Sequence, residues 1–263
     1  MRAISIGYHD VVAEGGVAEE TLRQAPRRYT LDLGSFRDHL FHIHRQGAAV
    51  RTIDQFRRWE QDLPIFLTFD DGAIGSYTCI ADELEQFGWR GHIFVTTDWI
   101  GRPGFVNPQQ IRELRSRGHI IGSHTCSHPS RMSHLGWDAL RREWSVSCAI
   151  LSEILGERIR TASVADGYYS RKVGQAAAAS GLEVLFNSEP TTAISVVDDC
   201  LILGRYSIKA GMPGIASGAI AAGRIWPRWR QAALWEAKKT AKRLAGESYF
   251  SIRKLLFARA PPR

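Results

Sequence analysis

Two short apolar runs, each followed at once by side chains that bind metals, constrain the fold of this chain more than any other feature. The run at residues 64–67 leads into Thr68-Phe69-Asp70-Asp71-Gly72, and the run at residues 120–122 leads into the segment that begins at His124 and ends at His128. Each run is typical of a buried strand. One carboxylate and two imidazoles at strand ends would form a three-ligand site with a position left for water, as in catalytic zinc centres.

The rest of the chain alternates strand-like and helix-like segments. Short apolar segments typical of strands occupy residues 3–8, 64–69, 92–96, 119–123, 159–164 and 182–187. Apolar residues at helical spacing occupy residues 36–47, 80–88, 107–118, 137–155 and 170–180. This alternation predicts a parallel sheet covered by helices, either open or closed into a barrel, with ligands at the carboxyl ends of the strands. Both motifs lie at such ends, so the predicted fold and the predicted site agree.

The size and composition fit one α/β domain, with or without an appendage. No run in the 263 residues nears the roughly 20 apolar residues that cross a bilayer. The amino terminus resembles a strand rather than a signal peptide, because it holds a very short apolar run and no small-residue cleavage site. The four cysteines are scattered, which favours reduced thiols and a cytoplasmic location. Cys126, between the two histidines, is interpreted as a packing residue in preference to a metal ligand.

Positive charge is concentrated at the carboxyl end. Residues 1–223 hold 23 basic and 25 acidic residues, whereas residues 224–263 hold 11 basic and 2 acidic residues. The net charge of +7 is therefore the sum of −2 for the body and +9 for the tail. A nearly neutral body argues against nucleic acid as its partner. We expect two parts, a catalytic domain at residues 1–223 and a basic, Trp-rich helical tail at residues 224–263.

The tail has two interpretations, and the sequence leaves both open. One side of a helical wheel collects the apolar residues Trp226, Trp229, Ala233, Ala237 and Leu244. Trp, Leu and Phe combined with basic residues are typical of a helix on an anionic membrane surface. The protein would then be peripheral at the inner face of the membrane and act on a lipid-linked or nascent glycan. Alternatively, a final helix packs on the domain and turns its basic face to solvent.

The two motifs make specific demands on the local backbone. Neighbouring strand residues point to opposite faces, so Asp70 and Asp71 serve one site only if the strand ends there, and Gly72 permits the turn. One carboxylate would bind the metal, and the uncoordinated one would accept a proton from water. A separation of four residues puts His124 and His128 on one side if a helical turn begins there. The plainer alternative is a polar strand-to-helix turn and two surface histidines.

These residues resemble the polysaccharide deacetylase family with NodB homology, also called carbohydrate esterase family 4. Residues 68–72 match its T-F-D-D-G motif and residues 124–128 its H-[ST]-x-x-H motif without alteration, within a resemblance that covers roughly residues 1–210. The resemblance implies a distorted (β/α) barrel of about seven strands. It also implies a hydrolase that removes N-acetyl groups from amino sugars with a divalent metal, most often Zn²⁺. It assigns Asp70 as the general base and, as metal ligands, Asp71, His124 and His128.

The chain departs from the family pattern at the third motif. Residues 162–170 read A-S-V-A-D-G-Y-Y-S, with Ala165 where the variant form of the motif has Pro. The family holds the oxyanion of the reaction with a backbone N–H in this segment. The resemblance therefore assigns that role to Tyr168 or Tyr169.

Two further family residues lack an obvious counterpart. The Arg that braces the base is missing from the third motif, and the candidates to replace it are Arg160 and Arg205. No His follows His134, so the late Leu-x-His motif, whose His protonates the departing amine, is absent. The Tyr8-His9 segment resembles the Y-H found near the start of many members, and some members take the acid from there. We therefore predict His9 as the acid, with a core histidine hydrogen-bonded to backbone as the alternative.

Three functions fit these residues. The favoured one is metal-dependent removal of N-acetyl groups from an amino sugar or glycan. The second applies the same metal chemistry to a small non-sugar amide, because family variants with altered third motifs include such activities. The third is an inactive carbohydrate-binding relic, which the missing late His and Ala165 would suit. Asp70 argues against the relic, because binding alone needs no uncoordinated base.

Overall fold

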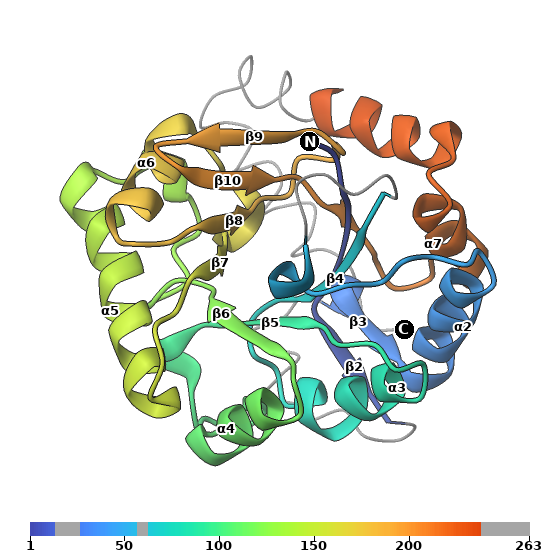
Figure 1. Cartoon of the computed structure of the whole chain (residues 1–263), viewed down its shortest axis with the longest axis horizontal. Helices are drawn as coiled ribbons and strands as arrows, with labels where there is room; N and C mark the ends of the chain where they lie inside the picture. Colours follow the sequence, from blue (N-terminus) through green and yellow to red (C-terminus); the bar gives the residue numbers. More distant parts are fainter. Residues whose placement is uncertain (14–26, 57–62, 238–263) are drawn as a thin grey trace, which may run out of the picture.

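One curled sheet carries the fold in the computed structural model, which describes residues 1–13, 27–56 and 63–237 (Figure 1). Its nine strands follow one another in the order β11-β1-β4-β5-β6-β7-β8-β10-β9, and only β9 is antiparallel to its neighbour among these described strands. Their bounds are β1 Ile4–Tyr8, β4 Ile65–Phe69, β5 His92–Val95, β6 Ile120–Ser123, β7 Thr161–Ser163, β8 Val184–Phe186, β9 Ile194–Val197, β10 Cys200–Leu203 and β11 Tyr206–Ser207.

Helices surround the sheet on its outer side (Figure 1). The longer ones are α2 Leu33–His44, α3 Ala81–Glu85, α4 Pro108–Ser116, α5 Trp137–Leu155, α6 Arg171–Ala179 and α7 Gly214–Ala221. Single turns occupy η1 Arg27–Tyr29, η2 Ile53–Gln55, η3 Ser76–Ile80, η4 Thr97–Trp99, η5 Met132–His134 and η6 Ala165–Gly167. The β9 end of the sheet returns to β1 through an antiparallel bridge between Arg2 and Ala193. The predicted distorted (β/α) barrel is thereby confirmed.

Alternate residues of the strands face the interior of the barrel. On β4, Leu67 and Phe69 belong to the large apolar cluster between sheet and helices, whereas Phe66 belongs to a smaller inner cluster. The inner cluster consists of Ala3, Phe66, Phe94, Val184, Phe186, Leu201 and Leu203. It fills the interior below the carboxyl ends of the strands. The same two-residue period, continued past those ends, determines which polar side chains point inward.

The sequence pattern did not predict the last part of the sheet. β9 and β10 form a hairpin through Asp198 and Asp199, whose φ angles are 46° and 66°. A two-residue type I′ turn requires positive φ at both positions, and Asn-Gly or Asp-Gly is its usual signature. Here two aspartates adopt that backbone without glycine. A second small sheet, β2 Asp10–Val12 with β3 Thr30–Asp32, was likewise not predicted.

The first part of the basic tail forms a helix over residues 225–237 that contacts the barrel. The Gln231 side-chain amide donates to the Ser207 carbonyl at 3.4 Å, at the end of β11. Residues 238–263, with the remaining basic and apolar residues of the tail, lie outside the described residues. None of the helices in the described ranges combines the length and the apolar content that crossing a bilayer requires. The division at residue 223 stays a prediction.

Candidate active site

The inward period of the strands brings the two sequence motifs together. Asp70, His124 and Arg205 each stand an even number of residues beyond an inward-facing position of β4, β6 and β10, and Ser163 ends β7. Because neighbouring parallel strands end at the same edge of a sheet, their side chains converge above the inner cluster. The Ser163 hydroxyl donates to Asp70 Oδ1 at 3.0 Å, so residues 93 apart in sequence are in direct contact.

Asp71 reaches the same site because the chain turns directly after β4. Its φ is 76° and that of Gly72 is 75°, so both adopt left-handed backbone. The strand ends at Phe69 and turns at Gly72 as expected, whereas the left-handed backbone of Asp71 was not predicted. A Cβ atom on Gly72 would lie 3.0 Å from Val95 Cγ1, which restricts this position further. The strain of a left-handed aspartate is typical of functional sites.

Three potential metal ligands meet at this turn. Asp71 Oδ1 lies 3.4 Å from His124 Nε2 and 3.5 Å from His128 Nε2. One ligand atom from each residue falls within 4.8 Å of the other two. Asp71 is only 6% exposed, and burial would raise the pKa of its carboxyl. The two imidazoles outweigh burial and hold that pKa well below its ordinary value.

The hydrogen bonds of His124 fit a cation site between these atoms. Its Nδ1 lies 2.6 Å from Ser163 Oγ, and that hydroxyl donates onward to Asp70, so the network assigns the ring proton to Nδ1. Nε2 then turns a lone pair toward Asp71 Oδ1, a buried atom without a hydrogen-bond partner. Two electron pairs that face each other at 3.4 Å repel unless a cation lies between them. The donor set of one carboxylate and two imidazoles suits Zn²⁺.

The second carboxylate of the motif is held by different partners. Arg205 Nη1 donates to Asp70 Oδ1 at 2.7 Å, and Arg205 Nε donates to the Asn187 carbonyl at 2.9 Å. Burial alone would raise the pKa of Asp70, but Arg205 and His124 outweigh it and lower that pKa to about 2. Asp70 is therefore an ionised, fixed carboxylate beside the proposed metal ligands.

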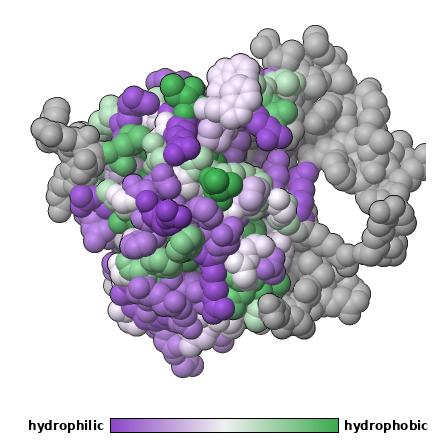
Figure 2. Space-filling view, turned by 90° about the vertical axis from the view of Figure 1, so that its right-hand side faces the viewer, coloured by the Kyte–Doolittle hydropathy of each residue, from purple (hydrophilic) through white to green (hydrophobic). Residues whose placement is uncertain are grey.

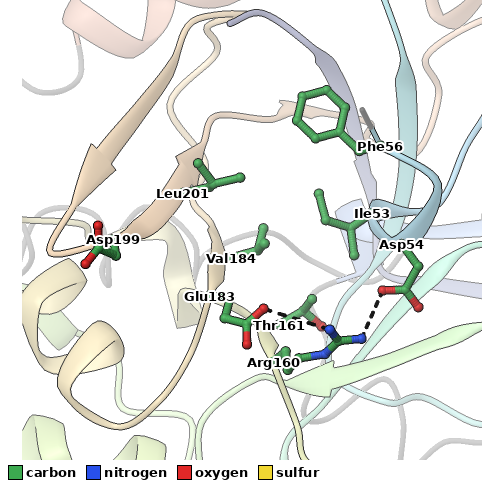
Figure 3. A pocket seen from close by; sticks show the side chains of 9 residues that line it. All are labelled: Ile53, Asp54, Phe56, Arg160, Thr161, Glu183, Val184, Asp199 and Leu201. Atoms are coloured by element: carbon green, nitrogen blue, oxygen red, sulfur yellow. Dashed lines mark hydrogen bonds and ion pairs between the residues drawn. The ribbon is translucent and has the colours of Figure 1, made fainter. Parts of the chain in front are cut away.

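Of the two arginines proposed to brace the base, only Arg205 is near it. Arg160 lies at the opposite end of the barrel, where it forms ion pairs with Asp54 at 3.4 Å and Glu183 at 3.9 Å (Figure 3). These side chains line a pocket of about 420 Å³ beside Thr161, the first residue of β7. The two arginines lie at opposite ends of the barrel because Arg205 follows the carboxyl end of β10, whereas Arg160 precedes the amino end of β7.

The expected helical turn between the two histidines is wrong. Residues 124–128 form a loop in which His128 has a φ of 56° and its backbone N–H donates to Thr125 Oγ1 at 3.0 Å. Glu143 of α5 accepts from the backbone N–H groups of Cys126 and Ser127, both at 2.9 Å. These bonds satisfy the loop amides that a helix would leave free. The imidazole centroids nevertheless lie 5.1 Å apart.

Sequence reasoning did not single out Ser163, Glu143 or Trp99. Ser163 carries a weak signal, since it ends a predicted strand at the edge that bears the motifs. Glu143 carries none, because its contacts depend on where α5 packs. Trp99 stacks on His128 with a centroid separation of 4.9 Å. Cys126 Sγ contacts Asp98 Oδ1 at 3.3 Å and is not part of the ligand cluster, as its interpretation as a packing residue implies.

His9 lies at the same edge of the barrel, two residues after Gly7. A Cβ atom on Gly7 would face Arg205 Cδ at 3.7 Å, so this face of β1 looks into the interior. Burial lowers the pKa of His9, and the charges of Asp71 and Asp70 oppose that shift. The His9 ring stacks on Tyr29 at 4.5 Å, and Nδ1 is buried without a hydrogen-bond partner in the part of the chain that the structure describes. That atom does not form the backbone hydrogen bond that the alternative interpretation requires.

The third-motif segment forms the turn η6 directly after β7. Asp166 and Gly167 have φ angles of 52° and 68°. The backbone N–H of Tyr169 donates to the Gly167 carbonyl at 3.0 Å, so it is already engaged. Tyr168 and Tyr169 both stay predictions for the residue that holds the oxyanion.

Known proteins resemble this chain in sequence and in fold. The polysaccharide deacetylase family model matches residues 60–185, which include both motifs. The YxkH protein of Bacillus subtilis is 26% identical over 155 residues, which are 59% of this chain and 55% of that protein. The chitin deacetylase of Colletotrichum lindemuthianum is 38% identical over 66 residues, which are 25% of this chain and 27% of that enzyme. The chain thus matches about half or less of the length of these relatives.

A solved structure extends the likeness to most of the fold. The Streptococcus pyogenes deacetylase PplD, solved in complex with acetate, superposes with a TM-score of 0.68 at 19% identity, over 81% of this chain and 95% of that one. At this identity the comparison supports the fold, and the likeness in sequence rests on the sequence matches. In sequence over residues 60–185, and in fold, the chain thus resembles the polysaccharide deacetylase family.

Proposed function

We propose that this protein is a metal-dependent hydrolase that removes N-acetyl groups from an amino sugar or glycan. One observation carries the proposal: Asp71, His124 and His128 converge on one point, and Asp70 is held beside them by other partners. A site for binding alone would need neither the ionised Asp70 nor the buried Arg205 that fixes it. The resemblance of the chain to the polysaccharide deacetylase family supports the same reaction class.

The roles of the side chains follow from their surroundings. Asp71, His124 and His128 would hold the metal, which we propose to be Zn²⁺. A bound divalent metal polarises an amide carbonyl and acidifies water, and both effects promote amide hydrolysis. Asp70 receives the proton of the attacking water, because it is ionised and its Oδ1 is anchored by Arg205 and Ser163.

The departing amine needs a proton, and we assign this step to His9. Burial keeps the pKa of His9 below its ordinary value, so the ring is neutral in the resting protein at pH 7. In the proposed step, Asp70 passes the proton that it took from the water to the neutral His9 ring, and His9 gives that proton to the amine nitrogen as the C–N bond breaks. The backbone N–H of Tyr168 or Tyr169 is our proposed donor to the oxyanion.

Replacing His9 with Phe tests the acid role. The ring of Phe keeps the stacking on Tyr29 but has no proton to give. We expect at least a hundredfold fall in turnover, the lower range for general acid catalysis, with the bound metal unchanged. Near-full turnover by a metal-loaded His9→Phe variant would remove His9 from the mechanism.

The names of the matched relatives support N-acetylated amino-sugar polymers as the substrate class. One is a chitin deacetylase, and another, from Bacillus cereus, is a peptidoglycan-N-acetylglucosamine deacetylase that is 30% identical over 93 residues. The matches cover 27% and 32% of those enzymes. The experiment below therefore compares chitin-like, peptidoglycan-like and small substrates.

The decisive experiment combines metal analysis with acetate release. The zinc-loaded chain is incubated with N-acetylglucosamine oligomers, peptidoglycan fragments and small acetamides, beside the Asp70→Asn and Asp71→Asn variants. We expect acetate from a sugar substrate, loss of zinc in Asp71→Asn, and retained zinc without turnover in Asp70→Asn. Turnover of small acetamides alone would favour the non-sugar amidohydrolase. Bound zinc with no acetate from any substrate would favour the carbohydrate-binding relic.

We also propose that residues 1–223 form the catalytic domain and residues 224–263 a basic, Trp-rich helical tail. The +9 charge of the tail, against −2 for the remainder, supports an anionic membrane as its partner.

A further inference from the structure

The helix at residues 225–237 turns large apolar side chains away from the domain. Three of its large apolar side chains are mostly exposed: Trp226 at 71%, Trp229 at 59% and Leu234 at 53%. The residues turned toward the barrel are less exposed and include Arg228, Gln231 and Trp235. A surface helix that covers a core normally does the opposite, with its apolar stripe inward. The outward stripe therefore indicates a partner outside the domain.

The outward stripe has the composition of a bilayer interface. The Trp226 and Trp229 rings stack with centroids 5.6 Å apart, and Arg230 is exposed beside them. Trp side chains favour the boundary between lipid head groups and acyl chains, and arginine favours anionic head groups. The tail as a whole carries a net charge of +9, which complements an anionic lipid surface but repels another copy of the same tail.

The basic surface continues onto the neighbouring helices. A groove of about 220 Å³ between α2 and α7 is lined by Arg45, Arg224 and the exposed Ile215. Phe41, half exposed on α2, has the Arg45 guanidinium 5.8 Å from its ring centroid. Figure 2 looks at the side of the molecule that bears α2 and α7, where apolar residues lie among hydrophilic ones. We name the exposed residues Phe41, Ile215, Trp226, Trp229, Arg230 and Leu234 the lipid face.

The inner side of the same helix lies on the rim that bears the candidate active site. Gln231 contacts Ser207 at the carboxyl end of β11. A Cβ atom on Gly167, at the end of η6, would lie 3.6 Å from the indole of Trp235. The helix thus adjoins the turn that follows β7, whose last residue, Ser163, contacts Asp70. A surface that binds the outer side of this helix is therefore close to the mouth of the site.

We propose that the lipid face binds an anionic bilayer and holds the catalytic mouth beside it, so that the substrate is an N-acetylated glycan attached to membrane lipid. The proposed membrane binding depends only on the exposed residues of the lipid face. The substrate class rests in addition on the deacetylase function proposed above.

Vesicle co-sedimentation with the full chain tests the surface. The vesicles contain phosphatidylcholine alone or with about a third phosphatidylglycerol. We expect the chain to bind the anionic vesicles, more weakly at high salt, and the Trp226→Ala/Trp229→Ala variant to bind at least tenfold more weakly. Trp137→Ala is the matched control, because Trp137 is 45% exposed on α5 and lies outside the lipid face. It should bind like the unaltered chain.

Several outcomes would overturn the proposal. These are no binding by the full chain, equal binding by the double Trp variant, or self-association of the chain that the double Trp variant abolishes in place of vesicle binding. Because loss of two Trp could disturb the helix, Arg230→Glu probes the same face by charge alone, and it should weaken binding to the anionic vesicles.

A second measurement separates the lipid face from the chemistry. Asp71→Asn should bind vesicles like the unaltered chain while releasing no acetate, so failure of deacetylation leaves the lipid face standing. For the substrate class, acetate release is compared between an N-acetylated glycolipid in anionic vesicles and the same sugar free in solution. The double Trp variant should lower the ratio of the two rates, and an unchanged ratio would reject a membrane-attached substrate.

Discussion

Two adjacent carboxylates in this site are ionised for different reasons. Asp70 is paired with Arg205 and hydrogen-bonded to Ser163, whereas Asp71 faces two imidazoles. Both are buried, so each charge would be costly without its own compensation. The separate partners would keep the two proposed roles apart: Asp71 Oδ1 faces the two imidazoles, and Asp70, held by Arg205 and Ser163, would serve as the base. Ser163 joins the two halves of the network.

Removal of the Ser163 hydroxyl should weaken metal binding. Ser163→Ala loses the nearer of two acceptors for the His124 Nδ1 proton, leaving the Ser163 carbonyl at 3.2 Å, and it loses a donor to Asp70. Loss of such outer contacts typically lowers metal affinity about 10- to 100-fold, and we expect this range in a competition titration with a zinc chelator. Ser217→Ala, at a buried serine of α7, is the control and should leave zinc affinity unchanged. Unaltered affinity in Ser163→Ala would contradict the proposed network.

The two arginines that the sequence could not separate should differ in their effect on stability. Arg205→Met leaves Asp70 as a buried charge without its cation, and breaking such a pair costs about 3–5 kcal/mol. Arg160→Met removes the ion pairs with Asp54 and Glu183, in which Arg160 is 51% exposed, and each such pair is worth about 0–1 kcal/mol. Urea unfolding of both variants at pH 7 measures the difference in free energy. Equal losses would mean that Arg205 does not carry the buried charge pair.

At the scale of elements, His92 connects a turn to the sheet. It lies on β5 and is fully buried. Its Nε2 accepts from the Ile53 N–H of η2 at 2.9 Å, and its Nδ1 lies 3.1 Å from the Leu67 carbonyl of β4. One ring nitrogen therefore accepts and the other donates, which requires the neutral ring. Burial lowers the pKa of His92 to about 4.

This histidine should make the fold less stable in mild acid. Between pH 6.5 and about 4 the unfolded chain binds a proton at His92 and the folded chain does not, so stability falls as pH falls through this window. From pH 7 to pH 5 the linkage is worth about 2 kcal/mol. Urea unfolding at both pH values should show this loss, and His92→Gln should reduce the difference by a similar amount. His134→Gln, at an exposed position, is the control, and a His92→Gln variant with an unchanged pH dependence would contradict the assignment.

At the scale of the whole molecule, the site ties together strands that are distant in sequence. The proposed ligands follow β4 and β6, and their supports come from β7, α5 and the segment after β10. The helix at residues 225–237 adds a contact with the end of β11 at the same edge. A metal that bridges Asp71 to both histidines would therefore stabilise the fold as well as the site.

Metal removal should lower the thermal stability of the whole domain. A ligand that binds only the folded state stabilises it by about 2.7 kcal/mol when its concentration is a hundred times Kd. We expect added Zn²⁺ to raise the Tm measured by calorimetry and a chelator to reverse the rise. Asp71→Asn should show no zinc-dependent shift. If added zinc leaves the Tm of the unaltered chain unchanged, this would argue against a metal held by these three residues.

The sequence by itself determined the class of fold and located the candidate metal ligands. Alternating periods of about 2 and 3.6 residues predict strands and helices, and ligands directly after strands must meet where parallel strands end. Local pattern was also sufficient for the turn at Gly72. The absence of the late Leu-x-His motif led to the prediction of His9 as the acid. The inward face of β1 agrees with that prediction, and the catalytic role of His9 stays a proposal.

Only the tertiary structure decided which distant groups support the site. The sequence offered no reason to prefer Arg160 or Arg205 as the partner of Asp70. In the structure Arg205 lies at the carboxyl end of a strand, beside Asp70, and Arg160 lies at the amino end of another. The loop between the histidines depends on Glu143, and the hairpin at Asp198 and Asp199 carries no glycine signal, so local propensity could predict neither. The physical reason is common to all these cases: hydrogen bonds and ion pairs between segments far apart in the chain depend on packing, which no short window of sequence contains.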